Sequence, residues 1–314
     1  MTKEKIKLSA SKIKTAEECS WLYYCKYILK LPDTSNSGAS RGTICHLIFE
    51  LLMRDRHKKY FEDLCSGKAG VIKNPAIHRL ILKNAKKLKV DDEENLDLIY
   101  DMIQTGLQSD YFCSGAVAVN VEEEFLIEEE NYLINGFVDK TAHYADGSVK
   151  VFDYKSSKAK FSKDEIDFNL QNLIYSLAVF KKHKTIPDLA FIFLKFRKQP
   201  IQQAPKPTEE QLKGFMEYLS YIAGYLSSFD QKTAVGNLAA KSMKKKWKCG
   251  SDVKGKWICP ARLPATFYYG VDDKDKFVRS SFVRQDLMDD SRVKLINEVK
   301  YQGCPFWRKD DLTF

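Results

Sequence analysis

The apolar pattern of the chain changes period near residue 118, and this change limits the folds open to it. Residues 119–129 (VNVEEEFLIEE), 132–144 (YLINGFVDKTAHY) and 148–156 (SVKVFDYKS) alternate apolar with polar side chains, which predicts three consecutive strands. Gly147 marks a hairpin between the last two. Residues 164–182 have amphipathic helix spacing, and residues 189–196 (LAFIFLKF) suit a buried strand. Strands and helices in this order predict an α/β fold.

Helical spacing dominates on both sides of this region. Earlier in the chain we expect helices at residues 9–30, at 39–61 and twice within 75–111. Later we expect a helix at 207–230, a hairpin from 266–272 and 276–282, and a final helix near 289–301. No linker or repeat interrupts the 314 residues, so we expect one domain in three parts: a helical N-terminal lobe (1–115), an α/β core (116–230) and an irregular, basic C-terminal extension (231–314).

Three charged side chains occupy related places on the predicted strands. Asp139 lies on the second strand, while Asp153 and Lys155 are two residues apart on the third and share a face. A short hairpin would bring Asp139 alongside them. Two carboxylates form an oxygen site suited to Mg²⁺ or Mn²⁺, and a lysine there can hold a water or offset negative charge on a reacting phosphate. The alternative is a salt bridge among the three residues; the D-x-K pattern on an apolar strand favours the site.

Two pairs of residues lie four apart on predicted helices and therefore share a helix face. His46 can offer a nitrogen ligand to a metal, and Glu50 can orient His46 or bind the metal through water. Gln171 and Tyr175 follow the D-x-K strand and can reach toward the same site or a phosphate. Each pair alone also fits a purely structural role.

Taken in order, these residues resemble the motifs of the RecB-like branch of the PD-(D/E)XK nuclease superfamily. The matching segments are Ser9-Ala-Ser11-Lys-Ile13 with Cys19, Gly42-Thr-Ile-Cys-His46-Leu-Ile-Phe-Glu50, Gly136-Phe-Val-Asp139, Asp153-Tyr-Lys155 and Gln171-Asn-Leu-Ile-Tyr175. Each motif is weak alone, but the ordered set across residues 9–180 is specific. The resemblance implies a restriction-endonuclease-like core, in which helices flank a central mixed sheet.

The resemblance also implies a divalent-metal-dependent DNA nuclease that hydrolyses phosphodiester bonds. Carried over by position, the implied metal ligands are His46, Asp139, Asp153 and the backbone carbonyl of Tyr154. The implied catalytic set is Lys155 with Asp139 and Asp153, helped by Gln171 and Tyr175. Two acids are expected in supporting roles: Glu50, and Glu124 on the first strand, where the family often carries an acid.

The activity expected from the resemblance is that of an exonuclease acting on DNA ends or single strands in recombination, repair or replication, similar to helicase-associated and CRISPR-adaptation nucleases. A structure-specific endonuclease, and an inactive DNA-binding or assembly module on the same fold, are the alternatives. No G-x-x-x-x-G-K-[ST] motif occurs, so unwinding would need a separate helicase, and a recombination or annealing protein is another expected partner.

The cell compartment expected from the sequence is the cytoplasm. No apolar run reaches the ~18 residues of a membrane span, and the N-terminus lacks the apolar stretch of a secretory signal. The size suits a phage or mobile-element protein, for which the compartment would be the host cytoplasm.

Charge favours a polyanionic partner. Lys and Arg number 51 against 42 Asp and Glu, and much of the net charge of +9 falls between residues 241 and 256. The residues expected to contact DNA are Arg41, Lys158, Lys244, Lys245, Lys246 and Lys248. Trp21, Tyr23, Tyr24 and Tyr27 on one helix are candidates for stacking on bases. The alternatives are a solvated basic loop and aromatic side chains in the core.

Eight cysteines occur without a CxxC pair, and a disulfide framework is not expected. Some superfamily members bind a 4Fe–4S cluster through one early and three closely spaced late cysteines. Cys19 matches the early position, but Cys249, Cys259 and Cys304 lack the compact late spacing. The spacing therefore favours ordinary reduced thiols over an iron–sulfur cluster or zinc.

Overall fold

A mixed six-stranded sheet is the centre of the first of two units in the computed structural model, which describes residues 5–33, 37–250 and 258–307. The first unit comprises residues 1–7 and 35–220, and the second comprises residues 8–34 and 221–314. Residues 8–34, which the sequence placed in the helical lobe, thus fall in the same unit as the C-terminal extension.

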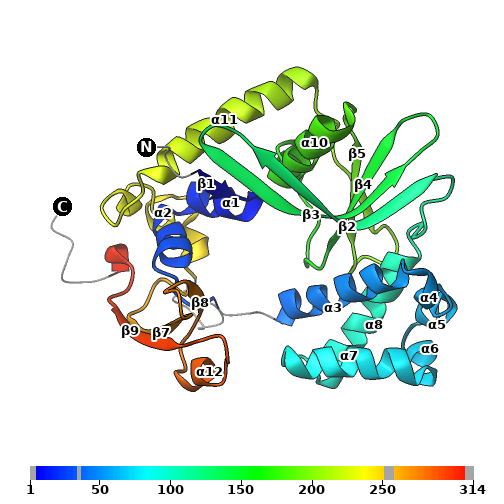
Figure 1. The fold of residues 1–314 in the computed structure, drawn as a ribbon, viewed down its shortest axis with the longest axis horizontal. Helices are drawn as coiled ribbons and strands as arrows, with labels where there is room; N and C mark the ends of the chain where they lie inside the picture. Colours follow the sequence, from blue (N-terminus) through cyan, green and yellow to red (C-terminus); the bar gives the residue numbers. More distant parts are fainter. Residues whose placement is uncertain (1–4, 34–36, 251–257, 308–314) are drawn as a thin grey trace. The chain divides into compact units, whose positions relative to one another are not determined.

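The strand order of the sheet is β1-β3-β4-β5-β6, with β2 also paired to β3 (Figure 1). The strands are β1 (Ile6–Leu8), β2 (Ala118–Glu128), β3 (Tyr132–His143), β4 (Val149–Lys155), β5 (Asp188–Phe193) and β6 (Ile201–Gln203). All pairs from β2 to β6 are antiparallel except β4 with β5, which is parallel. This confirms the predicted mixed sheet and its hairpin, in which Gly147 has a φ of 81°.

Helices cover both faces of this sheet (Figure 1). Tyr154, Ile192 and Leu194 pack on one face against the helical part of the unit. Its helices are α3 (Ser37–Leu52), α4 (Asp55–Lys58), α5 (Phe61–Cys65), α6 (Gly67–Lys73), α7 (Pro75–Lys87) and α8 (Glu93–Leu107). On the other side lie α9 (Lys163–Asp167) and α10 (Leu170–His183), within the connection between parallel strands β4 and β5. The helix α11 (Glu209–Ser227) follows β6 and continues into the second unit.

The second unit combines short helices with a three-stranded antiparallel sheet of order β8-β7-β9. Its strands are β7 (Ala265–Val271), β8 (Phe277–Ser281) and β9 (Leu295–Tyr301). Its helical segments are α1 (Ala10–Glu18), α2 (Ser20–Tyr23), η1 (Tyr24–Ile28), η2 (Thr233–Val235), η3 (Ala239–Lys241), η4 (Lys246–Cys249), α12 (Gln285–Met288) and η5 (Pro305–Trp307). Trp21, Phe267 and Tyr301 lie in its core, so Trp21 is not placed to stack on bases. Tyr23 is also buried.

Several predicted elements differ from the structure. The final helix expected near 289–301 is wrong, because Leu295–Tyr301 pairs with β7 as an antiparallel strand. The helix expected at 39–61 ends at Leu52, and the one expected at 164–182 is divided between α9 and α10. Asn169 caps α10, accepting hydrogen bonds from the backbone N–H groups of Gln171 and Asn172, which explains this division. Among the described helices, none has the length and apolar character needed to cross a membrane.

Candidate active site

The two carboxylates predicted from the sequence lie where β3 and β4 separate. Pairing of the strands runs from His143–Val149 to Lys140–Phe152, and Asp139 and Asp153 come next. Asp139 Oδ2 accepts a hydrogen bond of 2.8 Å from the backbone N–H of Tyr154, which bridges the opening. The side chain of Asp153 is 3% exposed. Burial raises the pKa of Asp153 to about 6, against the nearby charge of Lys155.

His46 reaches this opening from α3. Its Nδ1 is 3.4 Å from Asp139 Oδ1, and its Nε2 is 3.2 Å from the Tyr154 carbonyl oxygen. Burial lowers the pKa of His46, but the hydrogen bond to Asp139 and the charges of Asp139, Asp153 and Glu122 outweigh it and raise the pKa to about 8. The imidazole therefore faces two oxygen acceptors, which is an environment that stabilises positive charge.

Glu122 is a site residue that the sequence reasoning missed. The pairs Val121–Lys140 and Glu123–Val138 place it opposite Asp139, at a point where Glu122 has a φ of 48°. Ligand atoms of His46, Glu122 and Asp139 all lie within 4.8 Å of one another. Burial and the charge of Asp139 raise the pKa of Glu122.

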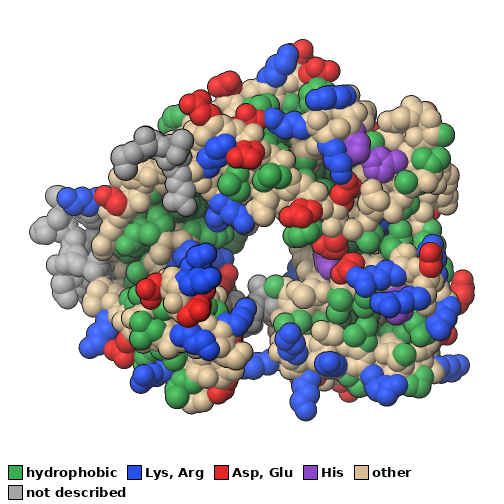
Figure 2. All heavy atoms as spheres, in the orientation of Figure 1, with side chains coloured by type: hydrophobic (Ala, Val, Ile, Leu, Met, Phe, Trp, Pro, Cys, Tyr) green, Lys and Arg blue, Asp and Glu red, His purple; other side chains and the backbone are tan. Residues whose placement is uncertain are grey.

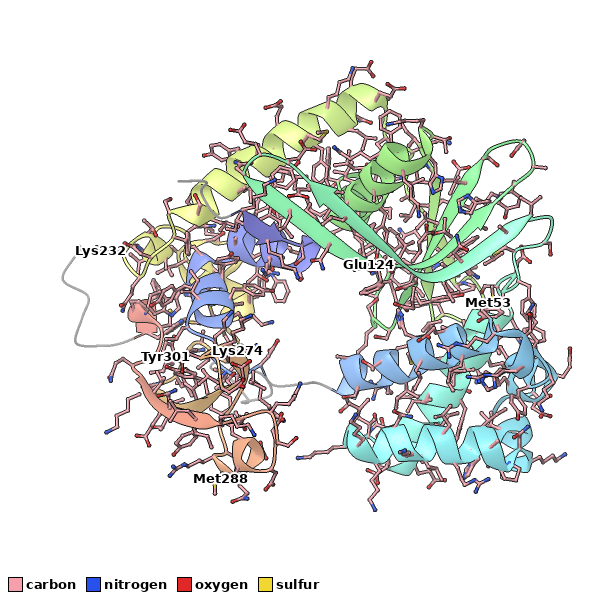
Figure 3. The ribbon with its side chains drawn as sticks, viewed as in Figure 1. Met53, Glu124, Lys232, Lys274, Met288 and Tyr301 are labelled. Carbon is pink, nitrogen blue, oxygen red and sulfur yellow. The ribbon has the colours of Figure 1, made fainter. Side chains whose placement is uncertain are left out.

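The acid expected from the sequence was Glu124, two residues further along β2 (Figure 3). It pairs with Phe137, is exposed, and does not belong to this three-residue group. Glu50, the other expected supporting acid, lines the same small pocket as His46, Glu122 and Asp139 and forms an ion pair of 2.5 Å with Arg54.

Lys155 and Gln171 complete a network on the α10 side of the sheet. Lys155 Nζ is 2.5 Å from Asp153 Oδ2 and donates a hydrogen bond of 2.5 Å to Gln171 Oε1. Gln171 Nε2 donates to Asp153 Oδ1 at 2.5 Å and to Tyr175 Oη at 2.7 Å. Tyr175 Oη lies 3.3 Å from Asp153 Oδ1, and burial raises the pKa of Tyr175 well above its ordinary value. Gln171 thus holds both the carboxylate and the ammonium group of the D-x-K motif.

Local sequence explains why these side chains meet. Asp153 and Lys155 point to one face of β4 because they are two residues apart, while Tyr154 points to the other and packs on Phe49 of α3. The Asn169 cap begins α10 at Leu170, and Gln171 and Tyr175 then lie one turn apart. One strand and one capped helix therefore create the network.

The residues present fit a hard divalent cation. Carboxylates of Glu122, Asp139 and Asp153, a histidine nitrogen and the Tyr154 carbonyl supply oxygen-rich coordination. Asp153 Oδ2 is buried and, apart from its ion pair with Lys155, has no hydrogen-bond partner among the described residues.

The residues expected to contact DNA have different environments. Lys158, Lys244 and Lys246 are exposed. Lys245 Nζ instead donates a hydrogen bond to the Glu17 carbonyl oxygen, and Lys248 forms an ion pair of 2.6 Å with Glu18. Both lysines are thus engaged at the end of α1. Arg41 is 7% exposed and donates a hydrogen bond to Asn95.

The four cysteines that the sequence singled out line one pocket of the second unit. Cys19, Cys249, Cys259 and Cys304 surround it together with Leu22, Arg262 and Trp307. Burial, followed by the proximity of the other three thiols, raises the pKa of Cys259 to about 11. Tertiary contacts thus bring together thiols that the sequence spacing keeps apart.

Comparison with known proteins defines the class of this fold and site. The PD-(D/E)XK nuclease superfamily profile matches residues 7–259, which is more than half of the chain. The chain belongs to this superfamily, and the resemblance drawn from its motifs is confirmed.

The relatives of known name are helicase-associated nucleases from streptococci. The chain is 28% identical over 163 residues to a subunit of the ATP-dependent helicase/deoxyribonuclease of Streptococcus agalactiae serotype Ia, a match covering 50% of the chain and 14% of the relative. It is 26% identical over 199 residues to the Streptococcus mutans protein of the same name, covering 60% of the chain and 18% of the relative. The chain thus spans less than a fifth of these relatives.

A solved structure, the "Putative exonuclease" of Eubacterium rectale, aligns with a TM-score of 0.41 and 13% identity, covering 76% of this chain and 84% of that one.

Proposed function

We propose that this chain is a divalent-metal-dependent DNA exonuclease that acts on DNA ends or single strands in recombination, repair or replication. The observation that carries the proposal is the meeting of His46, Glu122, Asp139 and Asp153 beside a lysine held by Gln171. Superfamily membership and the names of the relatives support hydrolysis of DNA phosphodiester bonds.

The proposed metal is Mg²⁺ or Mn²⁺. His46, Asp139, Asp153 and the Tyr154 carbonyl would hold it, with Glu122 as a further carboxylate. When bound, such a cation lowers the pKa of water and stabilises charge on the phosphoryl oxygens. His46 would bind it as the neutral imidazole, so loading must remove the proton that Asp139 otherwise stabilises.

The chain's own groups supply orientation and charge. Lys155 lies on the same strand face as Asp153, so its ammonium group can hold the attacking water and offset charge that develops on the phosphate. Gln171 fixes that ammonium group and the inner oxygen of Asp153 together, and Tyr175 supports Gln171 from one helical turn away. Gln171 and Tyr175 are therefore positioning residues.

Digestion of end-labelled DNA tests this proposal. Linear single-stranded and double-stranded DNA should be degraded in Mg²⁺ or Mn²⁺, and Asp153→Ala should remove cleavage while preserving the fold. Normal cleavage by Asp153→Ala at saturating Mg²⁺ would refute the assignment of the site.

Two other activities are distinguished by the same substrates. A structure-specific endonuclease would cut circular DNA that contains a branch or a single-stranded region, which an exonuclease leaves intact. A catalytically inactive DNA-binding module would bind DNA without cutting any substrate. The relatives are named as parts of helicase/deoxyribonucleases, which supports a separate helicase, or a recombination or annealing protein, as partner.

We further propose that the four cysteines bind a metal cofactor, and we favour an iron–sulfur cluster. Four thiols around one pocket are a fitting donor set for either a cluster or zinc. Tetrahedral zinc needs sulfurs about 3.8 Å apart, from Zn–S bonds of about 2.3 Å. Within the described part of the chain, the three-ligand group tighter than 4.8 Å is His46, Glu122 and Asp139, so the wider cysteine spacing suits a cluster.

Metal analysis of anaerobically purified protein tests the cofactor. A cluster predicts iron and acid-labile sulfide in equal amounts with broad visible absorption, lost in Cys259→Ser. Cys65→Ser is a matched control, since Cys65 lies on α5 in the first unit. Zinc without iron would replace the cluster by a zinc site, and absence of both metals would refute the proposal.

A further inference from the structure

Two loops next to the candidate active site carry positive charge without acids. The loop after β4, residues 155–160, reads KSSKAK, and the loop after β5, residues 195–199, reads KFRKQ. Because β4 and β5 are parallel neighbours, both loops leave the same edge of the sheet, about 4.8 Å apart at their start. The first loop begins at Lys155, so this edge adjoins the D-x-K network.

The cations of the two loops lie close to one another. Burial, followed by the charges of Arg41 and Lys158, lowers the pKa of Lys195. Arg197 is neutralised by an ion pair with Asp101. Within the described ranges, Lys158, Lys160, Lys195 and Lys198 have no ion pair with a carboxylate, although Lys160 lies over the Phe196 ring.

Arg41 adds charge from α3 behind this edge. Its neighbour Gly42 packs so closely on the β4 loop that a Cβ atom there would lie 2.8 Å from Ser156 Oγ. Ser156 Oγ in turn donates a hydrogen bond of 3.2 Å to the Gly38 carbonyl oxygen. Arg41 is nine-tenths buried, and its Nε has no hydrogen-bond partner among the described residues. Asp92, which accepts hydrogen bonds from Asn95, is the acid whose charge acts with that of Arg41.

We propose that the edge formed by the loops after β4 and β5 binds the phosphate backbone of the DNA strand that enters the active site, with Lys158 and Lys195 as its principal contacts. This inference rests on the proposed function. Like charges held together without acids are stabilised by an anion, and consecutive backbone phosphates supply several. Lysines that contact phosphates position a strand without reading its sequence. The surface is distinct from the lysines at 244–248, which lie in the other unit.

Basic side chains are common elsewhere on this unit, so a control is needed. Figure 2 shows Lys and Arg side chains scattered over the helical part of the chain. Lys86 and Lys87 at the end of α7 are exposed and make no ion pair in the described structure. Lys86→Ala/Lys87→Ala therefore removes the same charge as Lys158→Ala/Lys195→Ala, but away from the proposed surface.

The test measures binding of a fluorescein-labelled 20-residue deoxythymidine oligonucleotide by anisotropy, with Ca²⁺ in place of Mg²⁺ so that binding is read without turnover. Lys158→Ala/Lys195→Ala should weaken Kd at least about tenfold at low salt and flatten the slope of log K against log salt by about 1.4, for two phosphate contacts of about 0.7 each. The control should keep both values. Thermal melting should be unchanged in both variants.

Each outcome decides one claim. Unchanged affinity and slope in Lys158→Ala/Lys195→Ala, or equal losses in the control, overturn the inference. Displacement of the oligonucleotide by an uncharged-backbone competitor as readily as by DNA also overturns it, because backbone charge would not be the recognised feature. If the double variant cuts DNA but binds normally, the inference fails and the nuclease survives; if the wild type binds as expected but never cuts, the proposed function fails alone.

Discussion

Replacing Gln171 by alanine isolates the network that holds the D-x-K motif. Its side chain makes three hydrogen bonds, and two of them join it to the charged groups of Asp153 and Lys155. The ion pair of 2.5 Å between Asp153 and Lys155, and the contact of Tyr175 with Asp153, remain in the variant. The site should therefore keep its charges and lose part of its alignment.

The size of the effect follows from the bonds removed. A hydrogen bond to a charged group contributes about 1.5–3 kcal/mol, and the remaining contacts of each partner limit the loss to about one such bond. That corresponds to a decrease in kcat of about 10- to 100-fold. We expect KM to change by no more than about twofold, because Gln171 is proposed to position Lys155 rather than to bind substrate. Cleavage of an end-labelled single strand at saturating Mn²⁺ measures both constants.

Two further variants make the result interpretable. Gln203→Ala changes an exposed glutamine on β6 of the same sheet and should behave as wild type. Gln171→Glu keeps an acceptor for Lys155 but places a second carboxylate beside Asp153, so it should lose at least as much activity as Gln171→Ala. The reasoning is refuted if Gln171→Ala retains kcat within about threefold of wild type, or if only its KM rises.

Three other perturbations test separate parts of the site. Lys155→Ala should keep metal and DNA binding but lower kcat by about 10²-fold or more, measured by single-turnover cleavage; a rise in KM alone would make Lys155 a phosphate-binding group. Glu122→Gln should weaken Mn²⁺ binding, measured by calorimetry, whereas Glu124→Gln should not; equal effects would contradict the pairing of Glu122 with Asp139. In EDTA, protonated His46 should stabilise the fold below about pH 6.5 and lose about 2 kcal/mol as the pH rises through about 8, because its pKa is raised by 1.5. Urea unfolding at pH 6 and pH 9 measures this difference, and a His46→Gln protein with the same pH dependence would exclude His46 as its source.

The central hairpin was accessible from the sequence because its signals are local. Alternation along residues 132–156 and a glycine at 147 specify two antiparallel strands, and residues two apart on β4 must share a face. The motif order then predicted that His46, Asp139 and Asp153 would meet, although His46 precedes Asp153 by more than a hundred residues. The structure brings them together, while their chemical roles stay predictions.

Glu122 escaped the sequence because three glutamates stand in a row at 122–124. Alternation alone puts Glu122 and Glu124 on one strand face and cannot choose between them. The choice follows from the β2–β3 register, which places Glu122 opposite Asp139 and Glu124 opposite Phe137. That register was the available signal.

The remaining differences come from tertiary contacts. The segment Leu295–Tyr301 has apolar positions compatible with either period, and pairing with β7 makes it a strand. The cysteines at 19, 249, 259 and 304 meet only because the start and end of the chain pack into one unit. The lysines at 158 and 195 are separated in sequence and become neighbours through the parallel pairing of β4 and β5.

The central claim is that the carboxylate and lysine site cuts DNA from an end. Its most direct measurement compares linear and covalently closed circular single-stranded DNA, each incubated with wild-type and Asp153→Ala protein in Mn²⁺ and in EDTA. The account predicts metal-dependent loss of the linear strand, persistence of the circle, and no cleavage by Asp153→Ala. Cleavage of linear DNA that continues in Asp153→Ala or in EDTA would contradict it.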